Sequence, residues 1–195
     1  VVDKSYEELV SLELIPFQAA VDNGVDMIMT AHIAYPQIER DTAISKEDEA
    51  EIYIPATLSD DIIKGIIRDK MNYEGVVVTD ALNMDAISKN FGEAEAVIMA
   101  IEADADILLM PTILRSQEDL EKLDNIISEV KLAVEEGRIT LEDIDDSVAR
   151  ILALKERRGI LHLSEDKRTF EERLTEAQAI VGSTRNKAVE RVVAE

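Results

Sequence analysis

The sequence predicts an α/β fold built on a parallel sheet, because short apolar runs alternate with amphipathic helical segments. Three continuous apolar runs are evident, at residues 26–31 (DMIMTA), 76–80 (VVVTD) and 106–110 (DILLM). Unbroken apolar runs of this length are typical of strands that are covered on both faces. Their alternation with helices indicates right-handed βαβ units. Two architectures fit: a small doubly wound sheet, or part of a (β/α)8 barrel, which needs eight strands.

Polar residues in front of apolar periodic segments predict where the helices begin. A glycine just after such a segment predicts where it ends, and Pro16 predicts a kink or a restart in the first helical segment. The predicted capping pairs are Ser5 with Glu8, Ser116 with Asp119, and Thr140 with Asp143. Ser59 is predicted to cap a helix that reaches Met71, and a further helix is predicted over 93–103. The helices that follow Ser116 and Thr140 are predicted to end at Gly137 and Gly159.

Two segments differ from this pattern. Residues 32–57 show little periodicity and predict a long irregular loop that follows the carboxyl end of a strand. Loops of that length inside compact domains are usually functional or disordered. The tail from Leu161 onward holds two amphipathic stretches, at 170–181 and 187–193. The start at Val1, without Met, indicates a processed or excised beginning.

Composition and charge narrow the classes of function. Apolar residues make up 46% of the 195 residues, enough for a core, but aromatic residues only 4%, so aliphatic side chains must fill it. Lys and Arg total 21 against 42 Asp and Glu, a formal charge of −21. This charge repels phosphate backbones and anionic membranes, so we expect neither nucleic acid nor a membrane as partner. No transmembrane run is present, and the absence of cysteine excludes disulfides.

Asp80 is the first candidate for chemistry. It follows the apolar residues 76–79, so rigid backbone would hold its carboxylate at the edge of the sheet where α/β enzymes react. A fixed, ionised carboxylate in that place is what a glycosidase nucleophile requires. The plainer interpretation is a helix-capping aspartate, which is common after a strand.

His32 is the second candidate, because it closes the first predicted strand and would face the same side as Asp80. It could bond a substrate hydroxyl or a carboxylate, or it could be satisfied by backbone in the layer of strand ends. A metal site is not indicated: the other histidine, His162, lies in the tail, and the acidic cluster at 47–51 is typical of a solvated loop.

The segment 75–84 (GVVVTDALNM) resembles the nucleophile segment of family 3 glycoside hydrolases, in particular their β-N-acetylglucosaminidase (β-hexosaminidase) branch. Thr79-Asp80-Ala81 departs from the Ser-Asp-Trp that is usual in the family's β-glucosidases. Further stretches agree with the family in order and spacing, so the resemblance covers nearly the whole chain: residues 16–32, 55–59, 106–111, 137–159 and 181–183.

The resemblance implies a partial TIM barrel, consisting of its last three βα units. Residues 1–159 would be the C-terminal portion of this catalytic domain, and residues 160–195 a helical linker toward an absent α/β sandwich domain. It also implies a retaining hydrolase for terminal β-linked N-acetylglucosamine, as in peptidoglycan fragments, with a covalent glycosyl intermediate on Asp80. His32 and Met84 would line the sugar site. No metal or cofactor is implied, and the compartment stays open.

In the same branch the acid/base residues, a His-Asp pair, and further sugar-binding residues precede the segment that corresponds to Val1. We therefore expect the 195 residues alone to be inactive. Three barrel strands leave two open edges, which predicts self-association or pairing with the missing half of the barrel.

Three alternatives are kept. The first is a β-glucosidase or β-xylosidase of the same family. The second is a complete small α/β enzyme, such as a lyase, that uses Asp80 and His32 as acid and base. The third is an acidic interaction module without chemistry, for which Asp80→Asn changes nothing measurable.

Overall fold

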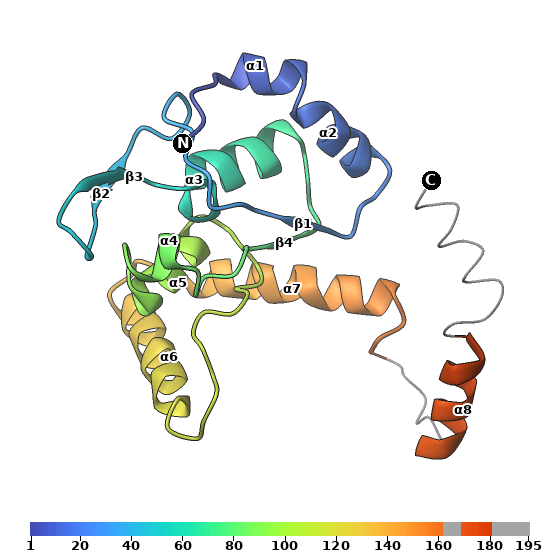
Figure 1. Cartoon of the computed structure of the whole chain (residues 1–195). Helices are drawn as coiled ribbons and strands as arrows, with labels where there is room; N and C mark the ends of the chain where they lie inside the picture. Colours follow the sequence, from blue (N-terminus) through green and yellow to red (C-terminus); the bar gives the residue numbers. More distant parts are fainter. Residues whose placement is uncertain (162–168, 181–195) are drawn as a thin grey trace. The chain divides into compact units, whose positions relative to one another are not determined.

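The computed structural model describes residues 1–161 and 169–180. Contacts divide the chain into two compact units, Val1–Arg158 and Gly159–Glu195. The first unit contains the sheet and most of the helices (Figure 1). Within the described part of the second unit the chain forms one helix, α8 (Phe170–Ile180), where the first amphipathic stretch of the tail was predicted. The second predicted stretch, 187–193, lies outside the described residues.

Two of the three predicted strands form and pair in parallel. Strand β1 (Met27–Met29) lies beside β4 (Val76–Val78), with Met27 opposite Val76. Both are shorter than predicted. The third predicted strand, 106–110, is a correction: it pairs with β4 through a single parallel bridge, between Val78 and Ile107. The α/β class and the parallel order are thus confirmed, but the pairing between β4 and the segment 106–110 stops after one residue pair.

The ladder stops because a bulge replaces its next pair. In a regular parallel ladder the amide of Leu109 would donate to the Thr79 carbonyl, and the amide of Ala81 to the Leu109 carbonyl. Instead Leu109 N donates to the Thr79 hydroxyl (2.9 Å), Ala81 N donates to the carboxylate of Asp80 (2.7 Å), and Leu82 N takes the Leu109 carbonyl (2.9 Å). Asp80 therefore sits in a bulge, a device that re-aims a side chain at the end of a strand.

The predicted helix starts are largely confirmed. Two of the three expected capping boxes, at Ser5 and at Thr140, are present, and Ser59 Oγ accepts from the amide of Ile62 (3.2 Å). The chain restarts a helix just before Pro16, which occupies its first turn and so removes no helical hydrogen bond. The helices of the first unit are α1 (Tyr6–Ser11), α2 (Leu14–Asp22), α3 (Asp60–Ile62) continued by the π-helix η2 (Ile63–Lys70), α4 (Asp85–Ser88), α5 (Glu93–Glu102), α6 (Leu120–Glu135) and α7 (Leu141–Arg157).

One predicted cap is wrong. Helix α6 begins after Asp119, which makes no side-chain cap of its own helix, so Ser116 and Asp119 form no capping box. The carboxylate of Asp119 instead accepts from the amides of Arg115 (2.9 Å) and Ser116 (3.0 Å), which closes a turn in front of the helix. These bonds, and Lys122, lower the pKa of the Asp119 carboxyl far below its usual value, with the bond from Lys122 as the largest cause.

The segment 32–57 is more ordered than predicted. It contains an antiparallel hairpin of β2 (Thr42–Ile44) and β3 (Glu51–Tyr53), with Thr42 opposite Tyr53 (Figure 1). Its strands are only three residues long, too short to show a clear alternation in the sequence. After the hairpin the backbone comes back beside the residues that follow β1, where Ala56 N donates to the Ile33 carbonyl (2.8 Å).

Aliphatic side chains fill the core, as the scarcity of aromatic residues predicts. All three residues of β4 are buried, and they pack with η2 and with the residues that follow Asp80. Helices α5 and α7 complete the unit, and α7 contacts β4 (Figure 1). The most deeply buried aliphatic side chains are Ile63, Val76, Val77, Leu82, Ile87 and Ile139. Rigid backbone therefore lies on both sides of Asp80.

Candidate active site

The carboxyl ends of β1 and β4 meet at one edge of the sheet because the strands are parallel. Residues 30–32 follow β1 at this edge, and residues 79–84 follow β4. The end of the third segment, 106–110, joins them, since Asn83 N donates to the Met110 carbonyl (3.0 Å). We call this the carboxyl edge. It brings His32 and the Asp80 bulge together, as the sequence predicts.

The Asp80 side chain is half-buried and lightly bonded. Its Oδ1 accepts from the amide of the next residue, Ala81, at 2.7 Å. Within residues 1–161 and 169–180, no cation forms an ion pair with it, and no donor is recorded for Oδ2. A carboxylate with two oxygens can accept about four hydrogen bonds, so most of its lone pairs are free for another group.

His32 is half-buried, and both of its ring nitrogens contact protein groups. Nε2 lies 2.9 Å from the carbonyl oxygen of Ala81, and Nδ1 lies 3.0 Å from Oγ1 of Thr57. A carbonyl only accepts, so we assign the proton of the neutral ring to Nε2 and make Nδ1 the acceptor. The Thr57 hydroxyl then donates to Nδ1 and accepts from Thr30 Oγ1, at 3.1 Å.

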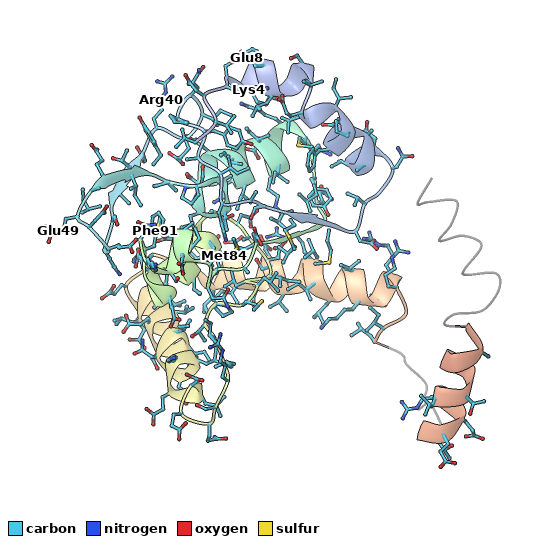
Figure 2. All side chains as sticks on the ribbon, in the orientation of Figure 1. Lys4, Glu8, Arg40, Glu49, Met84 and Phe91 are labelled. Carbon is cyan, nitrogen blue, oxygen red and sulfur yellow. The ribbon has the colours of Figure 1, made fainter. Side chains whose placement is uncertain are left out.

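Exposed methionines border the same edge. Met84 is 47% exposed and stands immediately before α4, where Figure 2 labels it. Met110 is 53% exposed and has a φ of 47°, in the left-handed region that non-glycine residues rarely adopt. Sequence reasoning singled out Met84 but missed Met110, Thr57 and Thr79. The two threonines carried no signal, because a buried hydroxyl that bonds across elements looks like any other threonine.

The opposite, amino edge of the sheet is ionic. The side chain of Asp106 is 0% exposed, and it accepts from Arg68 Nη2 (2.7 Å), Arg150 Nε (2.7 Å) and the amide of Val77 (2.7 Å). Asp104 accepts from the same two arginines, from Arg68 Nε at 2.8 Å and from Arg150 Nη2 at 2.6 Å. Burial lowers the pKa of Arg150, but the two carboxylates outweigh it and raise that pKa above its usual value.

Tyr73 and Gly75 belong to the same amino edge. The Tyr73 hydroxyl shares its proton between the carbonyls of Val25 (3.3 Å) and Val76 (3.4 Å). A Cβ atom on residue 75 would overlap the phenol ring, so only glycine fits in front of β4. Burial raises the pKa of Tyr73 to about 12.

Other kinds of site find no support in the part of the chain that the structure describes. No three His, Asp or Glu side chains converge there as a metal site would require. None of the described helices combines the length and the apolar character that crossing a bilayer takes.

Parallel strands joined by helices, with a lightly bonded carboxylate at their carboxyl edge, are typical of α/β enzyme domains, the TIM barrel among them. Comparison with known sequences identifies this domain: the chain belongs to glycosyl hydrolase family 3, since residues 1–154 match the family's N-terminal domain.

Named relatives agree with this assignment. The chain is 34% identical over 155 residues to beta-hexosaminidase A of Pseudoalteromonas piscicida, covering 79% of this chain and 26% of that protein. A beta-N-acetylglucosaminidase/beta-glucosidase of Cellulomonas fimi is 27% identical over 144 residues, covering 74% of this chain and 24% of the relative.

Solved structures show the same likeness. A family 3 beta-N-acetylglucosaminidase from Paenibacillus sp. superposes with a TM-score of 0.69 at 40% identity, covering 88% of this chain and 31% of that one. The present chain thus spans only about a quarter of the two curated relatives and about a third of this structure.

Proposed function

We propose that this chain carries the nucleophile of a retaining glycoside hydrolase that removes terminal β-linked N-acetylglucosamine, and that Asp80 is this nucleophile. The observation that carries the proposal is the Asp80 bulge, which turns a carboxylate with free lone pairs out of a rigid strand. The family match supports the reaction class. The names of two similar proteins, a beta-hexosaminidase and a beta-N-acetylglucosaminidase, support the sugar.

In the proposed reaction an oxygen of Asp80 attacks the anomeric carbon of the sugar. The bond from that carbon to the aglycone oxygen breaks, and the aglycone leaves with the bonding electrons and takes a proton from a general acid. Water then attacks the same carbon, gives a proton to the conjugate base, and releases Asp80. Two inversions retain the configuration.

The carboxyl edge supplies the sugar contacts in this proposal. Met84 offers an exposed apolar side chain to the sugar. His32 lies beside the Asp80 bulge, but both of its ring nitrogens are bonded to protein groups. It would therefore meet the sugar through its ring carbons rather than through a hydrogen bond.

The chain by itself is expected to be inactive toward ordinary substrates. Loss of general acid catalysis costs about two to four orders of magnitude in rate, and the family resemblance puts the acid/base pair outside the present sequence. Turnover of a nitrophenyl N-acetyl-β-glucosaminide by the pure 195-residue protein, abolished by Asp80→Ala, would refute this expectation.

A dinitrophenyl N-acetyl-β-glucosaminide tests the nucleophile itself, because its leaving group departs without a proton. We expect the 195-residue chain to gain the mass of one N-acetylhexosamine, and fragmentation to place the adduct on Asp80. Asp80→Asn is the variant that must not label, and Asp85→Asn, exposed at the start of α4, is the matched control that must label normally. An adduct on any other carboxylate would refute the assignment of Asp80 as the nucleophile.

We also propose that residues 1–159 are the C-terminal portion of the barrel and that residues 160–195 lead toward a further domain. In the described chain β1 pairs only with β4, and exposed apolar side chains line a hollow beside it, among them Met29 at 54% and Phe17 at 48% exposed. Such an edge supports self-association or pairing with the rest of a barrel. Light scattering over a wide concentration range tests this, and monomeric behaviour throughout would count against it.

A further inference from the structure

We infer that His32, Thr57 and Thr30 form a hydrogen-bonded chain whose purpose is to hold the Asp80 bulge, so that His32 is a positioning residue rather than an acid or a base. The inference deepens the proposed function and rests on it in taking Asp80 to be the nucleophile. Its structural content, a chain with a fixed direction that ends on the backbone beside Asp80, stands on the contacts alone.

The donor-to-acceptor direction of this hydrogen-bonded chain follows from its last acceptor, the Ala81 carbonyl. The Ala81 carbonyl can only accept, so His32 Nε2 donates to it across 2.9 Å. The neutral ring then offers Nδ1 as an acceptor, and the Thr57 hydroxyl donates to it across 3.0 Å. Thr57 Oγ1 is left to accept from Thr30, at 3.1 Å.

The members of the chain come from rigid and buried places. Thr57 is fully buried in the turn of 3-10 helix between β3 and α3, and Thr30 is 7% exposed directly after β1. Thr30 is itself fixed, because its amide donates to the carbonyl of Val78 at the end of β4 (2.9 Å). Both threonine hydroxyls are thus held in position before His32 is added.

The bulge needs such an anchor on this side. Toward the third segment it is fastened by backbone bonds, from Thr79 N to Ile107 and from Leu82 N to Leu109, both 2.9 Å. Between these bonds the amide of Ala81 donates to the Asp80 carboxylate instead of to the third segment. In the described residues the bond from His32 is the one side-chain contact recorded for the Ala81 carbonyl. The same carbonyl also accepts from the amide of Met84 (3.1 Å), inside the turn that follows the bulge, so the bond from His32 is the contact that ties this turn to the β1 side of the sheet.

The same contacts argue against the alternative in which Asp80 and His32 work as an acid/base pair. Nε2 gives its proton to a backbone carbonyl, and Nδ1 takes one from a buried hydroxyl. Neither nitrogen is left for a proton of the substrate.

Two spectroscopic readouts on the 195-residue chain test the inference without any substrate. Ring nitrogen NMR should show the neutral form of His32 as the Nε2–H tautomer, and because the chain has two histidines, His162→Gln completes the assignment. Amide hydrogen exchange at Ala81 and Leu82 should rise about fivefold in Thr57→Val, the effect expected from losing one hydrogen bond. Thr57→Ser, which keeps the hydroxyl, should restore protection, and Val77 in the middle of β4 should stay protected in both.

The labelling experiment separates this inference from the proposed function. If Asp80 is labelled, Thr57→Val and His32→Phe should slow labelling at least fivefold while Thr57→Ser does not. If the wild-type chain is never labelled, the proposed nucleophile loses its support, and the tautomer and the exchange rates alone decide the inference. An Nδ1–H tautomer overturns it. So does a Thr57→Val variant with unchanged exchange at Ala81 and Leu82, or with exchange raised equally at Val77.

Discussion

Two aspartates at opposite edges of the same sheet show two different environments for a carboxylate. Asp106, at the amino edge, is completely buried and bonded to two arginines and an amide. Asp80, at the carboxyl edge, is half-buried and bonded to a single amide, that of its neighbour. Removing a carboxylate from water is costly unless cations and donors replace the water, and Asp106 has both. Asp80 avoids that cost by staying partly solvated, which leaves its lone pairs free.

The two edges also differ in the groups that hold them. The amino edge is fastened by charges from η2 and α7, namely Arg68 and Arg150. The carboxyl edge is fastened by neutral groups, since Thr30, Thr57 and His32 bear no fixed charge in the arrangement assigned above. Because these groups are neutral, they place no fixed charge beside the Asp80 carboxylate. We therefore expect substitutions at the amino edge to change stability, and substitutions at the carboxyl edge to change the proposed chemistry.

The largest expected effect is on stability, at the amino edge. Asp106→Asn leaves the half-buried Arg68 and Arg150 with Asp104 as their remaining shared carboxylate, which should lower the free energy of unfolding by about 3 kcal/mol, the lower end of the range for a broken buried ion pair. Urea denaturation followed by circular dichroism measures it. Asp69→Asn, at an exposed position on η2, is the matched control and should change stability by less than about 0.5 kcal/mol. Equal effects in the two variants would mean that the network contributes nothing.

A smaller loss is expected where β4 begins. Gly75→Ala puts a methyl group into the Tyr73 ring, and the strand can relieve the overlap only by shifting. We expect a loss of about 1 to 3 kcal/mol, the usual range for overpacking. Thermal unfolding measures it, and Gly65→Ala is the control, because its added Cβ meets only one atom, at an ordinary distance of 3.8 Å. A Gly75→Ala variant as stable as Gly65→Ala would show that the amino edge is softer than its contacts indicate.

The sequence predicts the two edges unequally. The Asp80 position follows from local pattern, because an apolar strand that ends in aspartate is visible in residues 76–80. The capping boxes at Ser5 and Thr140 are equally local, and they are confirmed. The amino-edge network was missed because Arg68 and Arg150 lie in amphipathic helices, where a charge usually marks a solvated face.

The bulge could not be predicted for a similar reason. It depends on the Thr79 hydroxyl taking the place of a carbonyl opposite Leu109, a choice that the tertiary structure makes. The hairpin at 42–53 was missed because three-residue strands give too little periodicity to detect. Sequence pattern thus located the candidate nucleophile, while the contacts that orient it depend on residues far apart in the chain.

Alkaline pH should weaken the amino edge through Tyr73. Its pKa in the folded chain is about 12, above the ordinary tyrosine value of 10.0, because burial disfavours the phenolate. The folded state therefore holds its proton where the unfolded state has lost it, so this contribution is complete below pH 10 and disappears as pH rises toward 12. Denaturation at pH 9 and pH 11 should differ by about 1 kcal/mol more in the wild type than in Tyr73→Phe. Identical pH dependence in the two proteins would contradict the burial argument.

The smallest expected effect is the most informative about Asp80. Asparagine keeps the oxygen that accepts from the Ala81 amide, so Asp80→Asn should preserve the bulge while it removes the charge. The chain carries a net charge of −21, and losing one negative charge lowers its self-repulsion slightly. The free energy of unfolding should stay within about 0.5 kcal/mol of the wild type, or rise. Urea denaturation beside Asp106→Asn measures both aspartates on one scale. If Asp80→Asn lost several kcal/mol, Asp80 would be a second structural carboxylate, and the carboxyl edge would no longer be the place where this sheet keeps a carboxylate free.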